Sequence, residues 1–178
     1  TYPSIANVSA NETVTGDSDC NYTLWRNNKQ LINGSNVWNY TRLGNGTYTF
    51  KYNMSGTCAN WTLNSSQILY LYVNKGTPTL NLLLDGSASD KSVTYGATTN
   101  ATAYENNVGD SDINYTLYRN TTTTSTIIGT GSSVSDVQTS LAVGTYYYVY
   151  NNTAGANYTS NSFTRTLTIT SSTTQIST

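Results

Sequence analysis

A stretch of twelve residues occurs twice in this chain of 178 residues, and it constrains the fold more than any other feature. Residues 16–27 read GDSDCNYTLWRN and residues 109–120 read GDSDINYTLYRN, so ten of the twelve positions are identical at an offset of 93. A match of this length in so short a chain indicates two copies of one structural unit. One of the two differences replaces Cys20 by Ile113, which indicates that this position points into an apolar interior.

The repeat extends well beyond this stretch. LGNGTYTFKYN at 43–53 matches LAVGTYYYVYN at 141–151. The chain length suits two domains of ordinary small size. We therefore expect one domain over residues 1–74, a second over 75–170, and a C-terminal tail over 171–178.

Short segments with apolar residues at alternate positions predict β-strands in both units. Tyr22 and Leu24 share one strand face, as do Tyr115 and Leu117 in the second copy. No window shows the periodicity of a helix, and the abundant Thr and Tyr favour strands. The Thr/Ser-rich run 121–126 is expected to form an exposed loop. The pattern predicts an all-β protein built from two antiparallel β-sandwiches.

The composition excludes several classes of function. Only 10% of the residues are charged and the net charge is −1, which gives no electrostatic basis for binding nucleic acid or an anionic membrane. Histidine, the commonest general base and metal ligand, is absent. No apolar run approaches the about 18 residues of a membrane-spanning helix. We therefore expect neither an enzyme, nor a bound cofactor, nor a membrane span.

The two cysteines, Cys20 and Cys58, predict a disulfide bond. A thiol nucleophile or a metal-binding pair is the alternative, but both are poorly supported in a chain without histidine. A disulfide indicates an oxidising compartment outside the cytoplasm.

The glycosylation sequon N-x-[ST] occurs 14 times, about twice the number that chance would give. An Asn- and Thr-rich β protein can make sequons by accident, but the excess favours covalent N-linked glycans at many of them. The sequon asparagines are Asn7, Asn11, Asn21, Asn33, Asn39, Asn45, Asn53, Asn60, Asn64, Asn100, Asn114, Asn120, Asn151 and Asn157.

The pattern L-x-x-G-T-Y-x-x-x-Y, followed by a loop, N-[WY]-T and a last strand, resembles the tandem Ig-like repeats of archaeal and bacterial cell-surface and pilus-like filament proteins. The resemblance covers nearly the whole chain and implies an immunoglobulin-like β-sandwich for each unit. It makes Tyr48 and Tyr146 residues of the tyrosine-corner type. It assigns strand B to 5–12 and 98–105, strand C to 20–26 and 113–119, strand F to 47–53 and 145–151, and strand G to 67–73 and 164–170.

This assignment implies where the disulfide lies. Strands C and F are antiparallel neighbours in such a sandwich, so the start of C lies beside the end of F. Cys20 begins strand C and Cys58 follows strand F. We expect the bridge at one end of the first domain.

The first unit is expected to lack its own strand A. In the second unit the segment 77–93 precedes Thr94, and its Leu80, Leu82 and Leu84 alternate as in a strand. The first unit begins at Thr1, the residue equivalent to Thr94. A missing strand leaves an apolar groove and an unpaired sheet edge.

A strand from another copy can fill such a groove, and head-to-tail repetition of this contact makes a filament. Our hypothesis is that the tail 171–178 of one copy completes the first domain of the next. The alternative is that the sequence is a piece of a longer tandem array. Matching Tyr70 and Tyr72 with the inward Leu167 and Ile169 predicts apolar residues facing outward on the last strand of unit 1. The candidate assembly residues are Thr174, Gln175 and Ile176 in the tail and Leu69, Leu71 and Val73 on that strand.

Acidic residues occupy matched positions in both units, and they have two interpretations. They can bind Ca²⁺ through carboxylate oxygens, or they can build tight loops by hydrogen bonds to the backbone. The second is favoured because no complete run of calcium ligands is present, and a glycoside-hydrolase pair is disfavoured because no cleft is indicated. These residues are Glu12, Asp17, Asp19, Glu105, Asp110 and Asp112.

Other side chains have open roles. Arg26 and Arg119 can stack on the neighbouring aromatic residues or pair with the acidic loops. Trp38, Trp61 and Tyr147 can stack on sugars, either the protein's own glycans or those of a ligand.

Two non-enzymatic functions follow from the sequence, both extracellular or at the cell surface. The first is a structural subunit of a glycosylated, pilus-like filament whose partners are other copies of itself. The second is an adhesin or carbohydrate-binding module with a glycan ligand.

Overall fold

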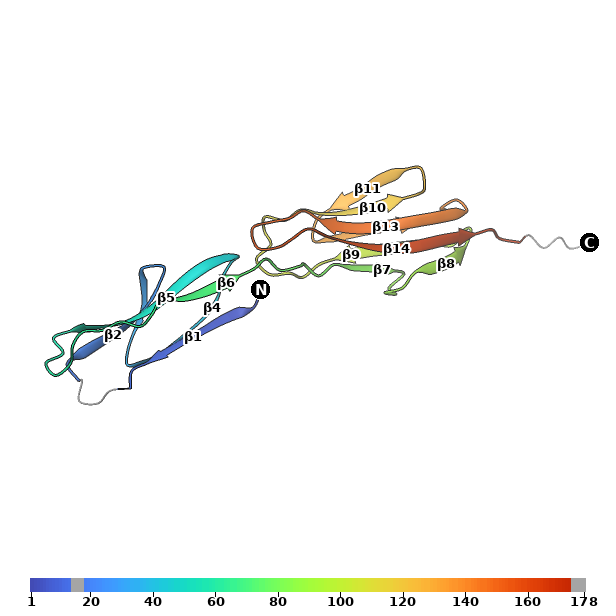
Figure 1. Ribbon diagram of the computed structural model, residues 1–178. Coiled ribbons are helices and arrows are strands. Elements are labelled where there is room, and N and C mark those ends of the chain that lie inside the picture. The colour runs from blue at the N-terminus through green and yellow to red at the C-terminus, as the bar shows by residue number, and fades with distance from the viewer. Residues whose placement is uncertain (14–17, 174–178) are drawn as a thin grey trace, which may run out of the picture. The chain divides into compact units, whose positions relative to one another are not determined.

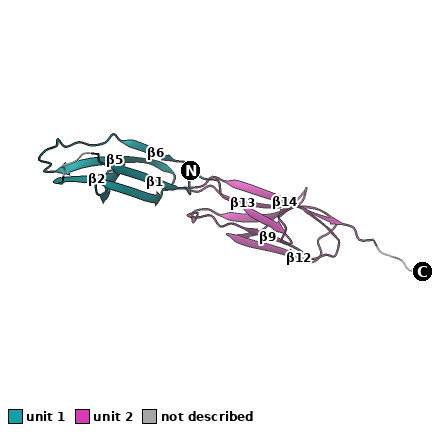
Figure 2. Ribbon diagram, turned by 90° about the horizontal axis from the view of Figure 1, so that it is seen from below, with its two compact units in different colours: residues 1–76 teal, residues 77–178 magenta. Residues whose placement is uncertain are grey.

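The structure, a computed structural model, is described over residues 1–13 and 18–173 (Figure 1). Within those ranges all regular secondary structure is β-strand, and no helix is long and apolar enough to cross a membrane. The chain divides into two compact units, Thr1–Gly76 and Thr77–Thr178 (Figure 2). The predicted all-β class with two tandem sandwiches is confirmed.

Unit 2 is a sandwich of two sheets. Its described strands are β7 (Asn81–Leu84), β8 (Lys91–Thr94), β9 (Thr99–Tyr104), β10 (Tyr115–Asn120), β11 (Ser125–Thr130), β12 (Ser133–Gln138), β13 (Gly144–Asn152) and β14 (Asn161–Thr170). One sheet has the order β11-β10-β13-β14-β8 and the other has the order β12-β9-β7. All neighbours are antiparallel except β8, which runs parallel to β14.

The core of unit 2 comes from alternate residues of facing strands. Leu117, Tyr148 and Tyr150, on the neighbouring strands β10 and β13, are 0% exposed. From the other sheet, Leu82 and Leu84 of β7 are 1% and 2% exposed. The first strand of unit 2 therefore contributes to the core as well as to the edge of its sheet.

Unit 1 repeats this plan with fewer strands. Its described strands are β1 (Ile5–Asn11), β2 (Cys20–Arg26), β3 (Lys29–Asn33), β4 (Asn36–Arg42), β5 (Gly46–Gly56) and β6 (Leu69–Val73). One sheet has the order β3-β2-β5-β6 and the other consists of β1 and β4. The predicted strands B, C, F and G correspond to β1, β2, β5 and β6 and to β9, β10, β13 and β14.

The tyrosine corners implied by the resemblance are present in both units. The Tyr48 hydroxyl donates to the carbonyl oxygen of Gly44, and the Tyr146 hydroxyl donates to that of Ala142, each at 3.0 Å. Each bond fixes the turn that leads into the central strand β5 or β13.

The predicted disulfide between Cys20 and Cys58 is also confirmed, with 4.7 Å between the two Cα atoms. Cys20 pairs with Gly56 in the β2–β5 ladder, so the bridge lies at one end of unit 1 as expected. Ile113, the residue equivalent to Cys20, is 8% exposed. The position is apolar in both units, and only unit 1 adds the covalent bond.

The predicted orientation of the last strand of unit 1 is wrong by one residue. Val73 matches Ile169, because each pairs with the glycine that begins the preceding strand. Val73 is buried, whereas Tyr70 and Tyr72, expected inside, are 60% and 66% exposed. The sequence LYLYV is apolar at every position, so alternation alone does not identify the inner face, and a slip of one residue exchanges the two faces.

The loop expected at 121–126 is shorter than predicted. The chain turns at 121–124, where the Thr121 hydroxyl accepts a hydrogen bond from the backbone N–H of Thr124 at 3.0 Å. Strand β11 already begins at Ser125. Thr and Ser suit an exposed edge strand as well as a loop, which is why composition alone misplaced the boundary.

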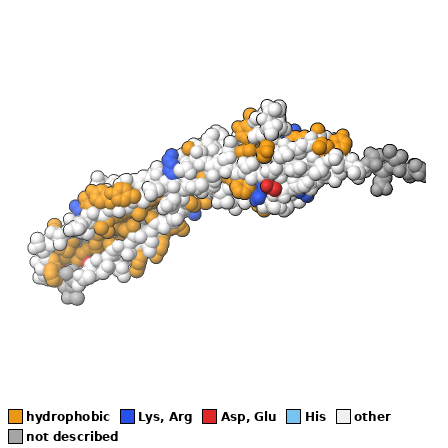
Figure 3. Space-filling model, turned by 45° about the vertical axis from the view of Figure 1, so that its right-hand side comes forward, with side chains coloured by type: hydrophobic (Ala, Val, Ile, Leu, Met, Phe, Trp, Pro, Cys, Tyr) orange, Lys and Arg blue, Asp and Glu red, His pale blue; other side chains and the backbone are white. Residues whose placement is uncertain are grey.

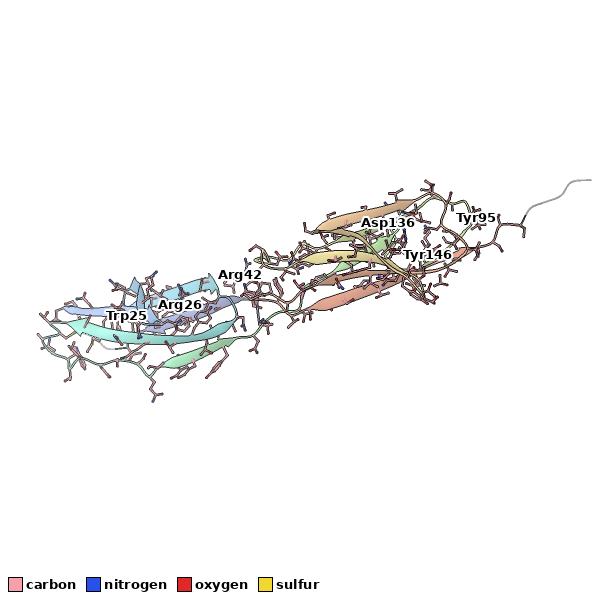
Figure 4. The ribbon with its side chains drawn as sticks, turned by 90° about the horizontal axis from the view of Figure 1, so that it is seen from above. Trp25, Arg26, Arg42, Tyr95, Asp136 and Tyr146 are labelled. Atoms are coloured by element: carbon pink, nitrogen blue, oxygen red, sulfur yellow. A yellow bond between two sulfur atoms is a disulfide. The ribbon has the colours of Figure 1, made fainter. Side chains whose placement is uncertain are left out.

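A buried charged network joins the two sheets of unit 2, and the sequence reasoning missed it. Asp136 on β12 is 6% exposed and lies inside the sandwich (Figure 4). Its Oδ2 accepts hydrogen bonds from Arg119 Nη1 at 2.5 Å and from the Tyr148 hydroxyl at 2.8 Å. Its Oδ1 accepts one from Gln138 Nε2 at 2.6 Å. Arg119 therefore pairs with this carboxylate, and not with a neighbouring ring or an acidic loop.

The equivalent network in unit 1 lacks its carboxylate. Strand pairing places Asn39 where unit 2 has Asp136, because Asn39 pairs with Val8 as Asp136 pairs with Ala101. Arg26 Nη1 and Asn39 Oδ1 are buried and make no hydrogen bond to any described residue.

Replacing Asp136 by Asn is expected to lower the unfolding free energy of unit 2 by about 3 kcal/mol, because the buried Arg119 guanidinium loses its counter-charge. Denaturant unfolding of this variant and of the natural protein would measure the difference in unfolding free energy. The reverse change, Asn39→Asp, supplies a carboxylate beside Arg26 and is expected to stabilise unit 1. Equal stability of Asp136→Asn and the natural protein would contradict the structural role of this pair.

Alkaline pH is expected to unfold unit 2 through its buried tyrosines. Burial and the hydrogen bond to Asp136 raise the pKa of Tyr148. Burial, with the nearby charges of Glu105 and Asp110, raises the pKa of Tyr150 to about 12. Both values exceed the ordinary pKa of about 10. The folded state therefore holds its protons longer than the unfolded state, so stability is complete below about pH 10 and falls as the pH rises toward the folded pKa.

Tyrosinate absorbance and circular dichroism, recorded together during an alkaline titration, would test this expectation. Tyrosinate from these side chains should form together with the loss of sheet signal, and Tyr148→Phe should move the transition to higher pH. Ionisation of the buried tyrosines in an intact sandwich would contradict it.

Candidate assembly groove in unit 1

The two units provide a direct comparison of the same sandwich with and without its first strand. Strand β1 is equivalent to β9, and β6 is equivalent to β14. The Tyr2 N–H donates to Asn74 O at 2.9 Å, and the Tyr95 N–H donates to Thr170 O at 2.8 Å, which is the same bond in each unit. Tyr2 therefore takes the position of Tyr95, which follows β8 in unit 2.

Two sheet edges that are covered in unit 2 have no partner strand among the described residues of unit 1. Strand β9 lies between β12 and β7, whereas β1 pairs with β4 alone. Strand β14 lies between β13 and β8, whereas β6 pairs with β5 alone. The expected absence of strand A is thus confirmed for residues 1–13 and 18–76. Both edges present backbone donors and acceptors that a further strand can pair with.

The missing strand also leaves the core of unit 1 open. In unit 2, Leu82 and Leu84 of β7 pair with Ala103 and Ala101, which are 0% and 1% exposed. The equivalent residues of unit 1, Ala10 and Val8, are only partly buried. Apolar side chains gather in the hollow face of unit 1 (Figure 3).

Two neighbouring cavities make up this hollow, which we call the assembly groove. One of about 220 Å³ is lined by Val8, Ala10, Leu24, Phe50 and Leu69, among others. The other, of about 430 Å³, is lined by Tyr22, Tyr52, Met54 and Trp61, among others. Strand β1 borders both, so one extended segment bound along its edge would pass over both cavities.

The structure changes the role of the three predicted contact residues on β6. Leu71 and Val73 point inward, so the expectation that they face outward is wrong. Leu69 shares their face, yet it is 64% exposed, because it lies at the open groove. The tail residues Thr174, Gln175 and Ile176 lie outside the described residues.

The acidic residues take part in loop hydrogen bonds. Asp19 Oδ2 accepts from the Ala59 N–H at 2.5 Å, and Asp112 Oδ2 accepts from the Ala156 N–H at 2.6 Å, an equivalent bond in each unit. Asp110 Oδ2 accepts from the Tyr115 hydroxyl at 2.6 Å.

The other three acidic residues of this set are Glu105, Glu12 and Asp17. Glu105 Oε2 accepts from the Asn107 N–H at 2.6 Å. Glu12 borders both the larger groove cavity and a neighbouring surface pocket, and Asp17 lies outside the described residues. Among the described residues, no group of three or more Asp, Glu, Cys or His is arranged to hold a metal ion. The observed bonds favour the loop-building interpretation of the sequence.

The sequon asparagines differ in accessibility. Eight are exposed: Asn7, Asn11, Asn21, Asn33, Asn45, Asn60, Asn64 and Asn114. The other six are partly buried: Asn39, Asn53, Asn100, Asn120, Asn151 and Asn157. Two of these six, Asn39 and Asn53, have a buried side-chain oxygen without a described partner.

The aromatic residues proposed to contact sugars are on the surface. Trp38 is 53%, Trp61 42% and Tyr147 37% exposed. Tyr40, which the sequence reasoning did not select, is 67% exposed and lies two residues from Trp38 on the same strand face. Alternation along residues 36–42 is the sequence signal that pairs them.

The strand order and the two tyrosine corners define the class of protein: a tandem pair of Ig-like β-sandwiches. No known family model matches the chain, and no curated protein matches it. Among solved structures, it is similar to the fibronectin(III)-like modules of Clostridium thermocellum CbhA, with 11% sequence identity and a TM-score of 0.36. That similarity covers 95% of this chain and 87% of the other.

Proposed function

We propose that this chain is a structural subunit of an extracellular, glycosylated filament. In this proposal the subunits join head to tail, and the C-terminal strand of one copy completes unit 1 of the next. The observation that carries the proposal is the assembly groove, an apolar hollow at the place that β7 fills in unit 2. It lies beside two sheet edges that pair with no further strand in the described part of unit 1. The disulfide supports an extracytoplasmic location.

The filled groove of unit 2 indicates how a donated strand would bind. Such a strand would pair antiparallel with β1 along Val8 and Ala10, as β7 pairs with Ala101 and Ala103. Each residue of β14 lies 96 positions after its equivalent on β6. The same offset makes Ile176 of the tail equivalent to Leu80, which is 8% exposed in unit 2. The tail thus offers an apolar side chain at a position that is buried in the complete unit.

Deleting residues 171–178 is the direct test. Negative-stain electron microscopy and light scattering are expected to show filaments for the full chain and monomers for the deleted chain. The point variant Ile176→Asp should weaken assembly in the same direction, because it places a charge in an apolar groove. The thermal unfolding of unit 2 serves as the folding control. Filaments that form equally well without the tail would overturn the strand-donation proposal.

A second candidate function is a cell-surface adhesin or carbohydrate-binding module that belongs to a longer tandem array. The exposed Trp38, Tyr40 and Trp61 favour it, because exposed aromatic rings offer stacking surfaces for sugars. A monodisperse monomer that binds glycans on an array would support this function over the first.

Glycosylation is expected to avoid the sequon at Asn39. Its side-chain oxygen is buried on the inner face of β4, so an attached glycan would prevent the two sheets of unit 1 from packing. Glycopeptide mass spectrometry of the native protein should find Asn39 bare and glycans on exposed sequons such as Asn21 and Asn114. A large glycosylated fraction at Asn39 in the folded protein would contradict this prediction.

A further inference from the structure

The outer face of the β1–β4 sheet carries an aromatic pair that the assembly groove does not use. Trp38 and Tyr40 occupy alternate positions of β4, and both point away from the core, at 53% and 67% exposure. The equivalent residues of unit 2 are Ser135 and Val137, as the pairing of β12 with β9 shows. The pair is therefore special to unit 1.

Two sequons lie on this same outer face. Asn7 pairs directly with Tyr40, and Ser9 pairs directly with Trp38. Asn11 is the next outward residue of β1 and is the diagonal neighbour of Trp38. Directly paired side chains have Cβ atoms about 5 Å apart, and diagonal ones lie about 7–8 Å apart. A glycan attached to either asparagine thus begins within reach of an exposed ring.

The chemistry of the two groups is complementary. A sugar ring has a face of C–H groups between its hydroxyls, and the electron-rich face of an aromatic ring attracts such weakly positive hydrogens. Among the described outward residues of β1 and β4, Arg42 is the only charged one, and its Nε already donates to the carbonyl oxygen of Pro3 at 3.1 Å. Stacking of an uncharged sugar therefore meets no competing charge at Trp38 and Tyr40.

We propose that Trp38 and Tyr40 form a stacking platform for the protein's own N-linked glycans at Asn7 and Asn11. The glycans lie along the β1–β4 face and cover the two rings. This inference rests on the glycosylation in the proposed function, and it is independent of strand donation.

Unit 1 contains a matched control for this platform. Tyr70 and Tyr72 form a second outward pair on β6, with ring centroids 6.4 Å apart and planes inclined by 14°. Their partners on β5 are Thr49 and Thr47, so no sequon asparagine lies opposite either ring. The control pair matches Trp38 and Tyr40 in exposure but has no sequon asparagine directly opposite either ring.

The test measures how well the glycans are protected from enzymatic trimming. Native glycosylated protein is treated with an exoglycosidase, and the trimming rate at each site is followed by glycopeptide mass spectrometry. In the double variant Trp38→Ala/Tyr40→Ala, trimming at Asn7 or Asn11 should become about threefold to tenfold faster. It should not change at Asn21 and Asn114.

The control double variant Tyr70→Ala/Tyr72→Ala should leave the rate at Asn7 and Asn11 unchanged. The conservative variant Trp38→Phe/Tyr40→Phe retains stacking rings and should keep the protection. It also separates loss of the platform from loss of folding.

Three outcomes would overturn the inference. Equal trimming rates in the platform variant and the natural protein would overturn it and leave the proposed function standing. The absence of glycans at both Asn7 and Asn11 would also overturn it. If glycans were absent from all 14 sequons, glycosylation would in addition be removed from the proposed function. A changed oligomeric state of the platform variant with unchanged trimming would assign these rings to contacts between copies.

Discussion

Grafting a second copy of residues 77–93 ahead of Thr1 is expected to stabilise unit 1 by about 3–6 kcal/mol and to stop head-to-tail assembly. The graft restores the order of unit 2, in which this segment leads into Thr94 and Tyr95. Its two leucines equivalent to Leu82 and Leu84 would enter the groove opposite Ala10 and Val8, and burial of a leucine contributes about 1.5–3 kcal/mol.

Assembly should be lost because the grafted strand has a much higher effective concentration than a strand on another molecule. Denaturant unfolding of unit 1 and electron microscopy of the same sample measure the two effects. A matched graft with Thr in place of the two leucines should stabilise unit 1 far less, because it offers the backbone but not the apolar side chains.

The two results also separate the two candidate functions. Under either candidate function the graft is expected to stabilise unit 1, because in both cases its groove is filled by a strand from outside residues 1–76. Only the strand-donation proposal predicts that the filaments disappear. Filaments that persist beside a stabilised unit 1 would show that assembly uses another surface.

Much of this structure was predictable from the sequence because the chain contains two copies of one unit, which can be aligned with each other. The duplicated stretch aligned the strands of the two units, and the alignment showed that unit 2 has a segment, 77–93, ahead of the residue equivalent to Thr1. The disulfide position followed from strands C and F being neighbours. These features depend on chain order and pairing, which a repeat preserves.

Other features were not predictable because they depend on packing between distant segments. Asp136 lies 17 residues from Arg119 and contacts it across the sandwich, and no local pattern joins the two. The orientation of β6 was missed because its apolar residues occupy both faces. Leu69 is exposed because β6 pairs with β5 alone among the described strands, so only the three-dimensional structure shows this exposure.

Removing the disulfide is expected to lower the unfolding free energy of unit 1 by about 4 kcal/mol, because the bond closes a separation of 38 residues. The variant Cys20→Ile/Cys58→Ala keeps both positions apolar, and Ile is the residue that unit 2 has at the first of them. Small domains have unfolding free energies of about 5–15 kcal/mol, so unit 1 would lose a large share of its stability. Unit 2 should unfold as before and is the internal control.

The disulfide and the missing strand are expected to be energetically linked. A sandwich with an open groove has less buried apolar surface, and a covalent bond between β2 and the end of β5 offsets part of that loss by restricting the unfolded chain. In the grafted chain, whose groove is filled, the Cys20→Ile/Cys58→Ala variant should therefore stay folded under conditions that unfold it without the graft. If unit 1 loses less than about 1 kcal/mol without its disulfide, then the bond does not compensate for the open groove, and the stability of the incomplete unit must come from its remaining packing.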